Sequence, residues 1–203
     1  MVTKVNGHSG DVKPFQHPAT VSEVLTDTSL FIESAFIAGE WVQGSSTFPV
    51  YDPATNGVIA NIANLDTAAF KKAIDHAAEA FVTFKETNEH YRSKLLHAWA
   101  ALIRKHAKDL AVILTMENGK TLAEAQGEVE YGASFISWFA EEAIRSYGDV
   151  IPSQHPNSTN LVIRQPIGVC GIIAVSDPSM SSEPALLYPC LASRLFFASP
   201  NRH

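Results

Sequence analysis

Cysteine, basic charge and long apolar runs are all scarce in this 203-residue chain. Its two cysteines, Cys170 and Cys190, cannot form a disulfide framework and lie in no Cys-x-x-Cys or Cys/His metal motif, so a reducing compartment, the cytoplasm, is the expected location. With 15 Lys and Arg against 21 Asp and Glu, the net charge is -6 and no basic cluster occurs, which argues against a nucleic-acid partner. No apolar run reaches the length that spans a bilayer, so no membrane partner is expected.

Glycine-rich nucleotide signatures are absent as well. Neither G-x-G-x-x-G nor a Walker motif occurs, so phosphate binding cannot be argued from glycine spacing, and the Gly168-x-x-Gly171 pattern at the strand entrance is too common to assign. What is present is the composition of a globular protein, with 46% hydrophobic and 18% charged residues. The length suits one ordinary domain or one and a half.

The N-terminal part predicts an arm followed by short strands. Residues 1–22 show no hydrophobic period, and we assign residues 1–29 to a flexible arm. Apolar runs separated by turn residues then predict a small antiparallel sheet. Its strands are expected within residues 36–42, which form a hairpin, and within residues 48–55 and 58–63.

Helical periodicity predicts four amphipathic helices after these strands. They are expected over residues 67–83, 89–106, 109–117 and 121–147. Their ends carry capping residues: Asp66 precedes the first helix, and Thr121 and Glu124 have capping-box spacing at the start of the fourth. Asn118-Gly119 supplies a left-handed C-terminal cap for the third. Small residues on the fourth helix would let another helix approach closely.

Two short buried strands are expected after the helices, over residues 161–164 and 169–174. The second is apolar throughout, which is typical of a strand covered on both faces in a parallel sheet. Strands, then a helical block, then the start of a parallel sheet predict an α/β fold. Ligands of open α/β sheets bind beyond the carboxyl ends of the strands, so the residues after Ala174 are where chemistry is expected.

Histidines and carboxylates elsewhere have simpler interpretations. Three of the eight histidines lie in or beside one predicted helix: His90, His97 and His106. They complete no metal-ligand spacing, so we interpret them as solvated surface residues. Glu141, Glu142 and Asp149 could form a pair for acid–base chemistry, but adjacent helical residues do not face each other, which favours a solvated helix face.

Neither cysteine is assigned a catalytic role. Cys190 has no base, helix N-terminus or cation near it in the sequence, so an incidental thiol is the favoured interpretation over a nucleophile. Cys170 lies in the middle of the strand over residues 169–174 and is expected to be a buried small hydrophobe. No catalytic residue and no metal ligand is therefore assigned in this chain.

Several long segments resemble the aldehyde dehydrogenase superfamily, and more closely its succinate-semialdehyde dehydrogenase branch. The family resemblance is carried by residues 36–41 (FIAGEW), 50–55 (VYDPAT) and 162–173 (VIRQPIGVCGII). The branch resemblance rests mainly on residues 117–120 (ENGK) and 134–143 (SFISWFAEEA). The resemblance covers residues 30–174. It implies the N-terminal portion of an α/β aldehyde dehydrogenase fold, ending in the first strand of a Rossmann-like parallel sheet.

The resemblance also implies a reaction and a cofactor. In this family a cysteine thiolate attacks an aldehyde, hydride passes to NAD or NADP, and water hydrolyses the resulting thioester. Ile173 and Ala174 match the end of the first cofactor-domain strand and are the cofactor-binding residues that the resemblance implies. A Pro-Trp-Asn-Phe-Pro motif follows that strand in the family, whereas residues 175–179 here are Val-Ser-Asp-Pro-Ser.

The departures from the family pattern fall on residues that carry chemistry. Asp177 takes the place of the asparagine that stabilises the oxyanion, and an ionised carboxylate cannot donate a hydrogen bond. Ala185 stands where this branch has an arginine for the distal carboxylate of the substrate. The glycine-rich cofactor loop, the general-base glutamate and the nucleophilic cysteine have no counterpart within residues 1–203. We therefore expect this chain alone to be inactive.

The break after Ala174 divides the chain into an arm (1–29), a partial aldehyde dehydrogenase domain (30–174) and a tail (175–203). The tail has no helical or strand period and is expected to be unrelated and disordered. A reading-frame change or a retained intron is one interpretation of the break, and a genuine specialised tail is the other. Translation of the coding DNA in the other two frames distinguishes them, because the first predicts recovery of Pro-Trp-Asn-Phe-Pro.

Residues 149–164 resemble the strands through which the family oligomerises. A homo-oligomer, or co-assembly with full-length subunits, is therefore an expected association. The main alternative to a dehydrogenase fragment is a non-catalytic interaction protein that regulates or poisons such an oligomer. A small binding module unrelated to catalysis is the third possibility, and only the generic apolar helices favour it.

Overall fold

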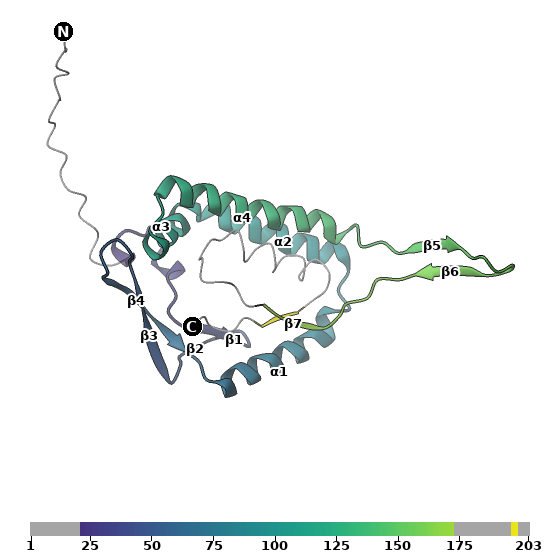
Figure 1. Ribbon diagram of the computed structural model, residues 1–203, viewed down its shortest axis with the longest axis horizontal. Helices are drawn as coiled ribbons and strands as arrows, with labels where there is room; N and C mark the ends of the chain where they lie inside the picture. Colours follow the sequence, from purple (N-terminus) through teal and green to yellow (C-terminus); the bar gives the residue numbers. More distant parts are fainter. Residues whose placement is uncertain (1–20, 173–195, 199–203) are drawn as a thin grey trace, which may run out of the picture.

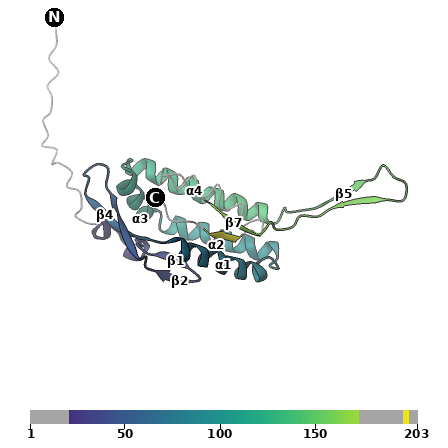
Figure 2. The same cartoon turned by 60° about the horizontal axis from the view of Figure 1, so that its bottom comes forward.

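The computed structural model describes residues 21–172 and 196–198 (Figure 1). Within these residues, helices α2 and α4 run side by side, and α1 lies across from them with strand β7 between. The two N-terminal hairpins lie at one end of this arrangement, and the β5–β6 hairpin projects from the other (Figures 1 and 2). No helix of the described residues is long and apolar enough to cross a membrane.

The described chain starts with two short 3-10 turns, η1 (Val21–Glu23) and η2 (Thr28–Leu30), of which η1 packs on helix α3. Val21 is buried in a cluster with Leu25 and Met116. The Asp109 carboxylate accepts hydrogen bonds from the backbone N–H of Thr26 at 3.0 Å and of Asp27 at 2.9 Å. The arm expected over residues 1–29 is therefore wrong for residues 21–29, which belong to the folded part.

The strands at the N-terminal end form two separate hairpins. Strands β1 (Ala35–Ile37) and β2 (Glu40–Val42) pair antiparallel, as do β3 (Ser46–Tyr51) and β4 (Val58–Asn64). Ala38 and Gly39 both have positive φ between β1 and β2, as a tight primed turn requires. The expected strands are confirmed, but they make two two-stranded sheets where one sheet was expected. Glu33 links the second hairpin to the preceding segment by accepting the N–H of Ala63 on its carbonyl and that of Asn61 on its carboxylate.

The four expected helices are present with the expected caps. They are α1 (Thr67–Phe84), α2 (Glu89–Lys105), α3 (Ala107–Asn118) and α4 (Leu122–Ala143). Asp66 accepts from the N–H of Ala69, and Thr121 with Glu124 forms a complete capping box. Gly119 ends α3 in the left-handed region at φ 78°. Helix α4 ends at Ala143, before the expected Tyr147, because the chain tightens into a turn before it enters strand β5.

The main core lies where α2, α3 and α4 meet. Its buried residues are Leu96, Ala100 and Ile103 of α2, Ala111 and Leu114 of α3, and Ala125, Val129, Ala133, Ile136, Ala140 and Ala143 of α4. Most of the α4 members are alanines, and Gly132 is also buried, so the axes of α2 and α4 can approach closely. This confirms the expectation drawn from the small residues of the fourth helix.

Strands β5 (Asp149–Pro152) and β6 (Thr159–Val162) form a projecting antiparallel hairpin in which every strand residue is exposed. The expectation of a buried strand over residues 161–164 is therefore wrong. A short apolar run has the same appearance in a buried strand and in an arm that projects from the molecule, so the sequence pattern alone could not separate the two. Leu161 and Ile163 are each 71% exposed.

Strand β7 (Val169–Gly171) pairs in parallel with β8 (Phe196–Ala198), so a parallel sheet does begin here. The described part of β7 ends at Gly171, inside the expected range of 169–174. Cys170 is half-buried, not fully buried as expected. The tail was expected to be disordered throughout, and this is wrong for residues 196–198, which form a strand.

Candidate functional site

The carboxyl end of β7 is where an α/β fold would bind a ligand. Gly168, with φ at 131°, turns the chain into β7, a backbone conformation that favours glycine. Ile173 and Ala174, the expected cofactor-binding residues, follow directly and lie outside the described residues. Asp177, Ala185 and Cys190 lie outside them too, so these assignments stay predictions.

A dinucleotide needs donors for its phosphates, usually from a glycine-rich loop or the N-terminus of the helix after the strand. The residues that follow Ile172, where such donors would stand, lie outside the described residues. The described residues place strand β7 beside helix α1.

A cavity of about 560 Å³ lies between the start of α2, the end of α4 and the chain that joins β6 to β7. Its lining includes Arg92, Tyr147, Ile163, Arg164 and Ile167. The Arg92 side chain is buried and donates from Nη1 to the carbonyl oxygen of Thr87 at 2.5 Å. Arg92 thus ties the loop before α2 to the helix, and the mostly exposed residues 163–167 form the outer wall.

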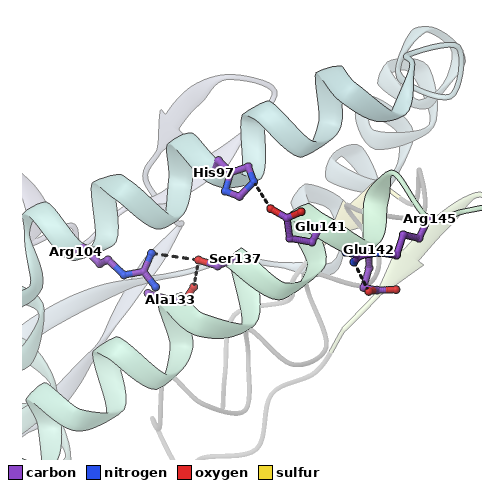
Figure 3. A network of polar contacts seen from close by, with 7 residues as sticks. All are labelled: His97, Arg104, Ala133, Ser137, Glu141, Glu142 and Arg145. Atoms are coloured by element: carbon purple, nitrogen blue, oxygen red, sulfur yellow. Dashed lines mark hydrogen bonds and ion pairs between the residues drawn. The ribbon is translucent and has the colours of Figure 1, made fainter.

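Polar contacts join α2 and α4 along the solvent side of their seam (Figure 3). His97 Nε2 lies 3.0 Å from Glu141 Oε1. Arg104 Nε donates to Glu130 at 2.9 Å, and its Nη1 donates to Ser137 Oγ at 3.1 Å. Ser137 in turn donates to the carbonyl of Ala133. Each ionic partner here is about half exposed, so the network orients the two helices more than it stabilises them.

The carboxylates that could have made an acid–base pair have different partners. Glu141 contacts His97 across the helix seam, whereas Glu142 accepts from Nη1 of Arg145, in the turn just after α4, at 2.7 Å (Figure 3). Asp149 opens the projecting hairpin in register with Val162. These three carboxylates therefore do not converge on one point, and no acid–base site is built from them.

The histidines are likewise spread over the surface. His76 pairs with Glu79 on α1, and His106 Nδ1 lies 3.8 Å from Asp27. Among the described residues, no three His, Cys, Asp or Glu side chains are grouped closely enough to hold a metal ion. We assign no metal ligand in this part of the chain.

Asp27, Asp109 and Glu124 each have a carboxyl group with a lowered pKa, and each serves local structure. The pKa of Asp109 is lowered chiefly by the hydrogen bond from the Thr26 amide. That of Asp27 is lowered chiefly by the Ser29 side chain, and that of Glu124 by the Thr121 side chain. Each group accepts hydrogen bonds as an anion in a cap or turn. None faces the carboxyl end of β7, so these shifts mark anchors of the fold.

Comparison with known proteins decides the family. The aldehyde dehydrogenase family model matches residues 41–176, well over half of the chain. A succinate-semialdehyde dehydrogenase (NADP⁺) from Saccharomyces cerevisiae is 45% identical over 150 residues, which cover 73% of this chain and 30% of that protein. The chain belongs to the aldehyde dehydrogenase family.

Two further relatives agree with this aldehyde dehydrogenase assignment. A glutarate-semialdehyde dehydrogenase from Pseudomonas putida is 44% identical over 73% of this chain and 32% of its own length. The crystal structure of a succinate-semialdehyde dehydrogenase from Burkholderia pseudomallei superimposes with a TM-score of 0.75 at 32% identity, covering 88% of this chain and 44% of that one. The chain thus spans about 30% of the length of the curated relatives it matches.

The resemblance stated from the sequence segments is therefore confirmed, and so is the incomplete α/β fold. Sequence reasoning missed the anchoring of the N-terminal strap (residues 21–30) by Asp109, since its partners are more than 80 positions away along the chain. It also missed the pairing of β8 with β7. The apolar run at residues 195–197 was a signal for that strand, but it stands alone in an otherwise aperiodic tail.

Proposed function

We propose that this chain is the N-terminal portion of an NAD(P)-dependent dehydrogenase that oxidises a semialdehyde to a carboxylic acid. The observation that carries the proposal is the 45% identity with the yeast succinate-semialdehyde dehydrogenase. Relatives at similar identity are named for glutarate semialdehyde and aspartate semialdehyde. A short aldehyde with a carboxylate at its far end is the substrate class that these names share.

We further propose that the 203-residue chain alone does not catalyse this oxidation. Acyl transfer through a cysteine needs an activated thiolate and donors for the oxyanion. Cys170 lies half-buried within β7, in a strand and not beside a base. Asp177 holds the sequence position that the family gives to an asparagine donor, and its ionised carboxylate would repel a developing oxyanion.

Two proteins test these proposals separately. The first is the purified 203-residue chain, assayed for reduction of NAD⁺ and NADP⁺ with succinate and glutarate semialdehydes; any turnover overturns the proposed inactivity. The second is a chimera in which residues 30–174 replace the matching portion of the yeast relative. Semialdehyde oxidation by the chimera supports the proposed parent activity. A folded chimera with no activity, beside an active yeast parent, argues against it.

The cofactor and the compartment are proposals of the same kind. Ile173 and Ala174 are proposed to keep the cofactor-facing backbone of the parent, for which NAD and NADP are equal candidates. Calorimetric titration of the chimera with each dinucleotide tests them, and equal affinity after Ala174→Asp would remove these residues from the site. We propose the cytoplasm as the compartment, although the rat relative is named as mitochondrial, and a fluorescent fusion distinguishes the two.

A second candidate function is co-assembly with full-length subunits. The observation that favours it is the β5–β6 hairpin, whose strand residues are all exposed and which offers apolar side chains to solvent. Val150 and Leu161, a register pair, are each 71% exposed. Monomeric proteins seldom expose a projecting apolar edge of this kind, because it promotes pairing with another chain.

Co-expression of the tagged chain with the yeast relative tests this candidate. Co-elution in size-exclusion chromatography and a fall in the relative's activity are expected. Leu161→Lys should abolish co-elution. The lysine charge would be buried without a partner between the two paired strands, which is much less favourable than leaving it in solvent. Leu102→Lys is the matched control, since Leu102 is an exposed leucine on α2, away from the hairpin. Equal co-elution of both variants would contradict the hairpin as the contact.

A further inference from the structure

The three residues of β8 occupy a defined place beside β7. Val169, Cys170 and Gly171 are in parallel register with Phe196, Phe197 and Ala198. The family model ends at residue 176, so β8 lies in sequence that does not follow the family pattern. Yet its backbone takes the place next to the first strand, where a parallel sheet would continue.

Helix α1 depends on these two strands for its packing. Its closest neighbouring elements are β8 and β7, while α2, α3 and α4 pack mainly on one another. In Figure 1, α1 lies apart from the α2–α4 pair, with β7 between them. Since most helical stability comes from tertiary packing of an apolar face, the β7–β8 pair is what holds α1 to the rest of the molecule.

A lone β7 would present unpaired N–H and C=O groups on both sides. Such an edge pairs readily with strands of other chains. In this structure one side of β7 is occupied by a segment of the same chain. The segment is apolar in sequence, Leu195-Phe196-Phe197, which suits a strand that is covered by a helix.

We infer that residues 196–198 act as an intramolecular closing strand that occupies one edge of β7, holds α1 in place and prevents that edge from pairing with a second chain. This inference concerns the chain by itself and holds whether or not the dehydrogenase activity proposed above is confirmed. It gives the C-terminal segment a structural role that its sequence, taken alone, did not indicate.

Cross-linking in register is a direct test. Cys170 and Phe197 are paired positions, and adjacent strands bring such positions within the separation that a disulfide spans. In a Cys190→Ser background, Phe197→Cys should form an intramolecular disulfide with Cys170 under mild copper–phenanthroline oxidation. Phe196→Cys is the matched control, because successive strand positions lie on opposite faces, and it should react at least about tenfold more slowly.

The cross-linking outcome is decisive in either direction. Rapid reaction of Phe197→Cys alone, within one chain at high dilution and lost in urea, is the expected result. Equal rates for the two variants would overturn the register. A disulfide between two chains would overturn the inference as well, since β8 would then serve another copy.

A proline substitution tests the role of the strand. Phe197→Pro removes a ladder N–H and should speed hydrogen exchange in residues 169–171 and on α1 by about tenfold, with more intermolecular association. Ser193→Pro, just before β8, is the control. Unchanged exchange in β7 and α1 after Phe197→Pro would overturn the inference. Equal acceleration in the α2–α4 core would also count against it, because the strand would then have no local role.

Discussion

Gly148 lies directly against the backbone of Val162, at the base of the β5–β6 hairpin. A Cβ atom on Gly148 would lie 2.1 Å from the Val162 carbonyl oxygen, far inside any contact that two atoms tolerate. The clashing group is backbone, which cannot rotate away as a flexible side chain could. The close approach therefore fixes where the chain leaves the α4 exit turn and enters the hairpin, and it requires glycine.

Gly148→Ala should open the base of the hairpin and cost about 1–3 kcal/mol or more locally, as overpacking typically does. Hydrogen exchange of the β5–β6 ladder should rise while that of the helical core stays unchanged. Gly127→Ala is the control, because Gly127 has no neighbour within 4 Å of the added Cβ. That change should stabilise α4 by about 0.5–1 kcal/mol. Unaltered hairpin protection in Gly148→Ala would contradict the contact.

The left-handed cap of α3 should be more sensitive to alanine than an equally left-handed turn elsewhere. Gly119 has φ 78°, and its added Cβ would lie 2.7 Å from Pro53 Cγ; Gly39 has φ 86° with nothing within 4 Å. In both variants, an alanine in the left-handed backbone region destabilises the folded state by roughly 1–2 kcal/mol. Gly119→Ala should incur about 1–3 kcal/mol more from the Pro53 contact. Urea unfolding measures the stability of each variant. Equal losses of stability would show that Pro53 moves aside without an energetic cost.

Local chemistry accounts for the parts of the fold that the sequence predicted well. Asp66, Thr121 with Glu124, and Gly119 act within a few residues of themselves, so their spacing was enough to place three helix ends. The family segments did the same for the fold class, since they run from the N-terminal hairpins through helix α4 to β7. These features depend on short-range hydrogen bonds and on periodicity, which a single sequence displays.

Long-range partners account for what could not be predicted. Asp109 binds the N-terminal strap although it lies more than 80 positions further along the chain, and no residue near 21–30 indicates this partner. Leu161 sits in an apolar run that suits a buried strand, but the hairpin projects away from the core. At the candidate site the sequence placed the strand, while the residues expected to contact the cofactor, Ile173 and Ala174, lie outside the described residues and remain untested.

The strap anchored by Asp109 should loosen in acid. The folded-state pKa of Asp109 lies below its usual value near 3.8, chiefly because the Thr26 amide donates to the carboxylate. Its contribution is therefore fully present above that usual value and is lost as the pH falls through the lower, folded-state pKa. Asp109→Asn should destabilise the strap at neutral pH, since an amide is a weaker acceptor, and the difference from wild type should shrink below about pH 4.

Urea unfolding at neutral and acidic pH, with hydrogen exchange over residues 21–30, measures this prediction. Glu124→Gln is the matched control: its pKa is also lowered, but by Thr121 within the α4 capping box, so it should leave the strap unaffected. If Asp109→Asn lost the same stability at both pH values, the charge of the carboxylate would not be what anchors the strap.

The α2–α4 seam should depend on its buried apolar residues far more than on its ion pairs. Ile136 is fully buried, and Ile136→Ala should cost about 2–5 kcal/mol through lost burial and the cavity it leaves. Arg104 is partly exposed, so removing its contacts with Glu130 and Ser137 by Arg104→Ala should cost about 1 kcal/mol or less.

A double-mutant cycle of Arg104→Ala with Glu130→Ala isolates the ion pair from the packing of the arginine stem. Its coupling energy should be about 0.2–1 kcal/mol and should fall with added salt, since exposed charges are screened. Thermal and urea unfolding give the four stabilities. If the coupling instead approached the loss from Ile136→Ala and did not respond to salt, the polar contacts in Figure 3 would be the principal link between α2 and α4, and the small side chains of α4 would serve only to let them form.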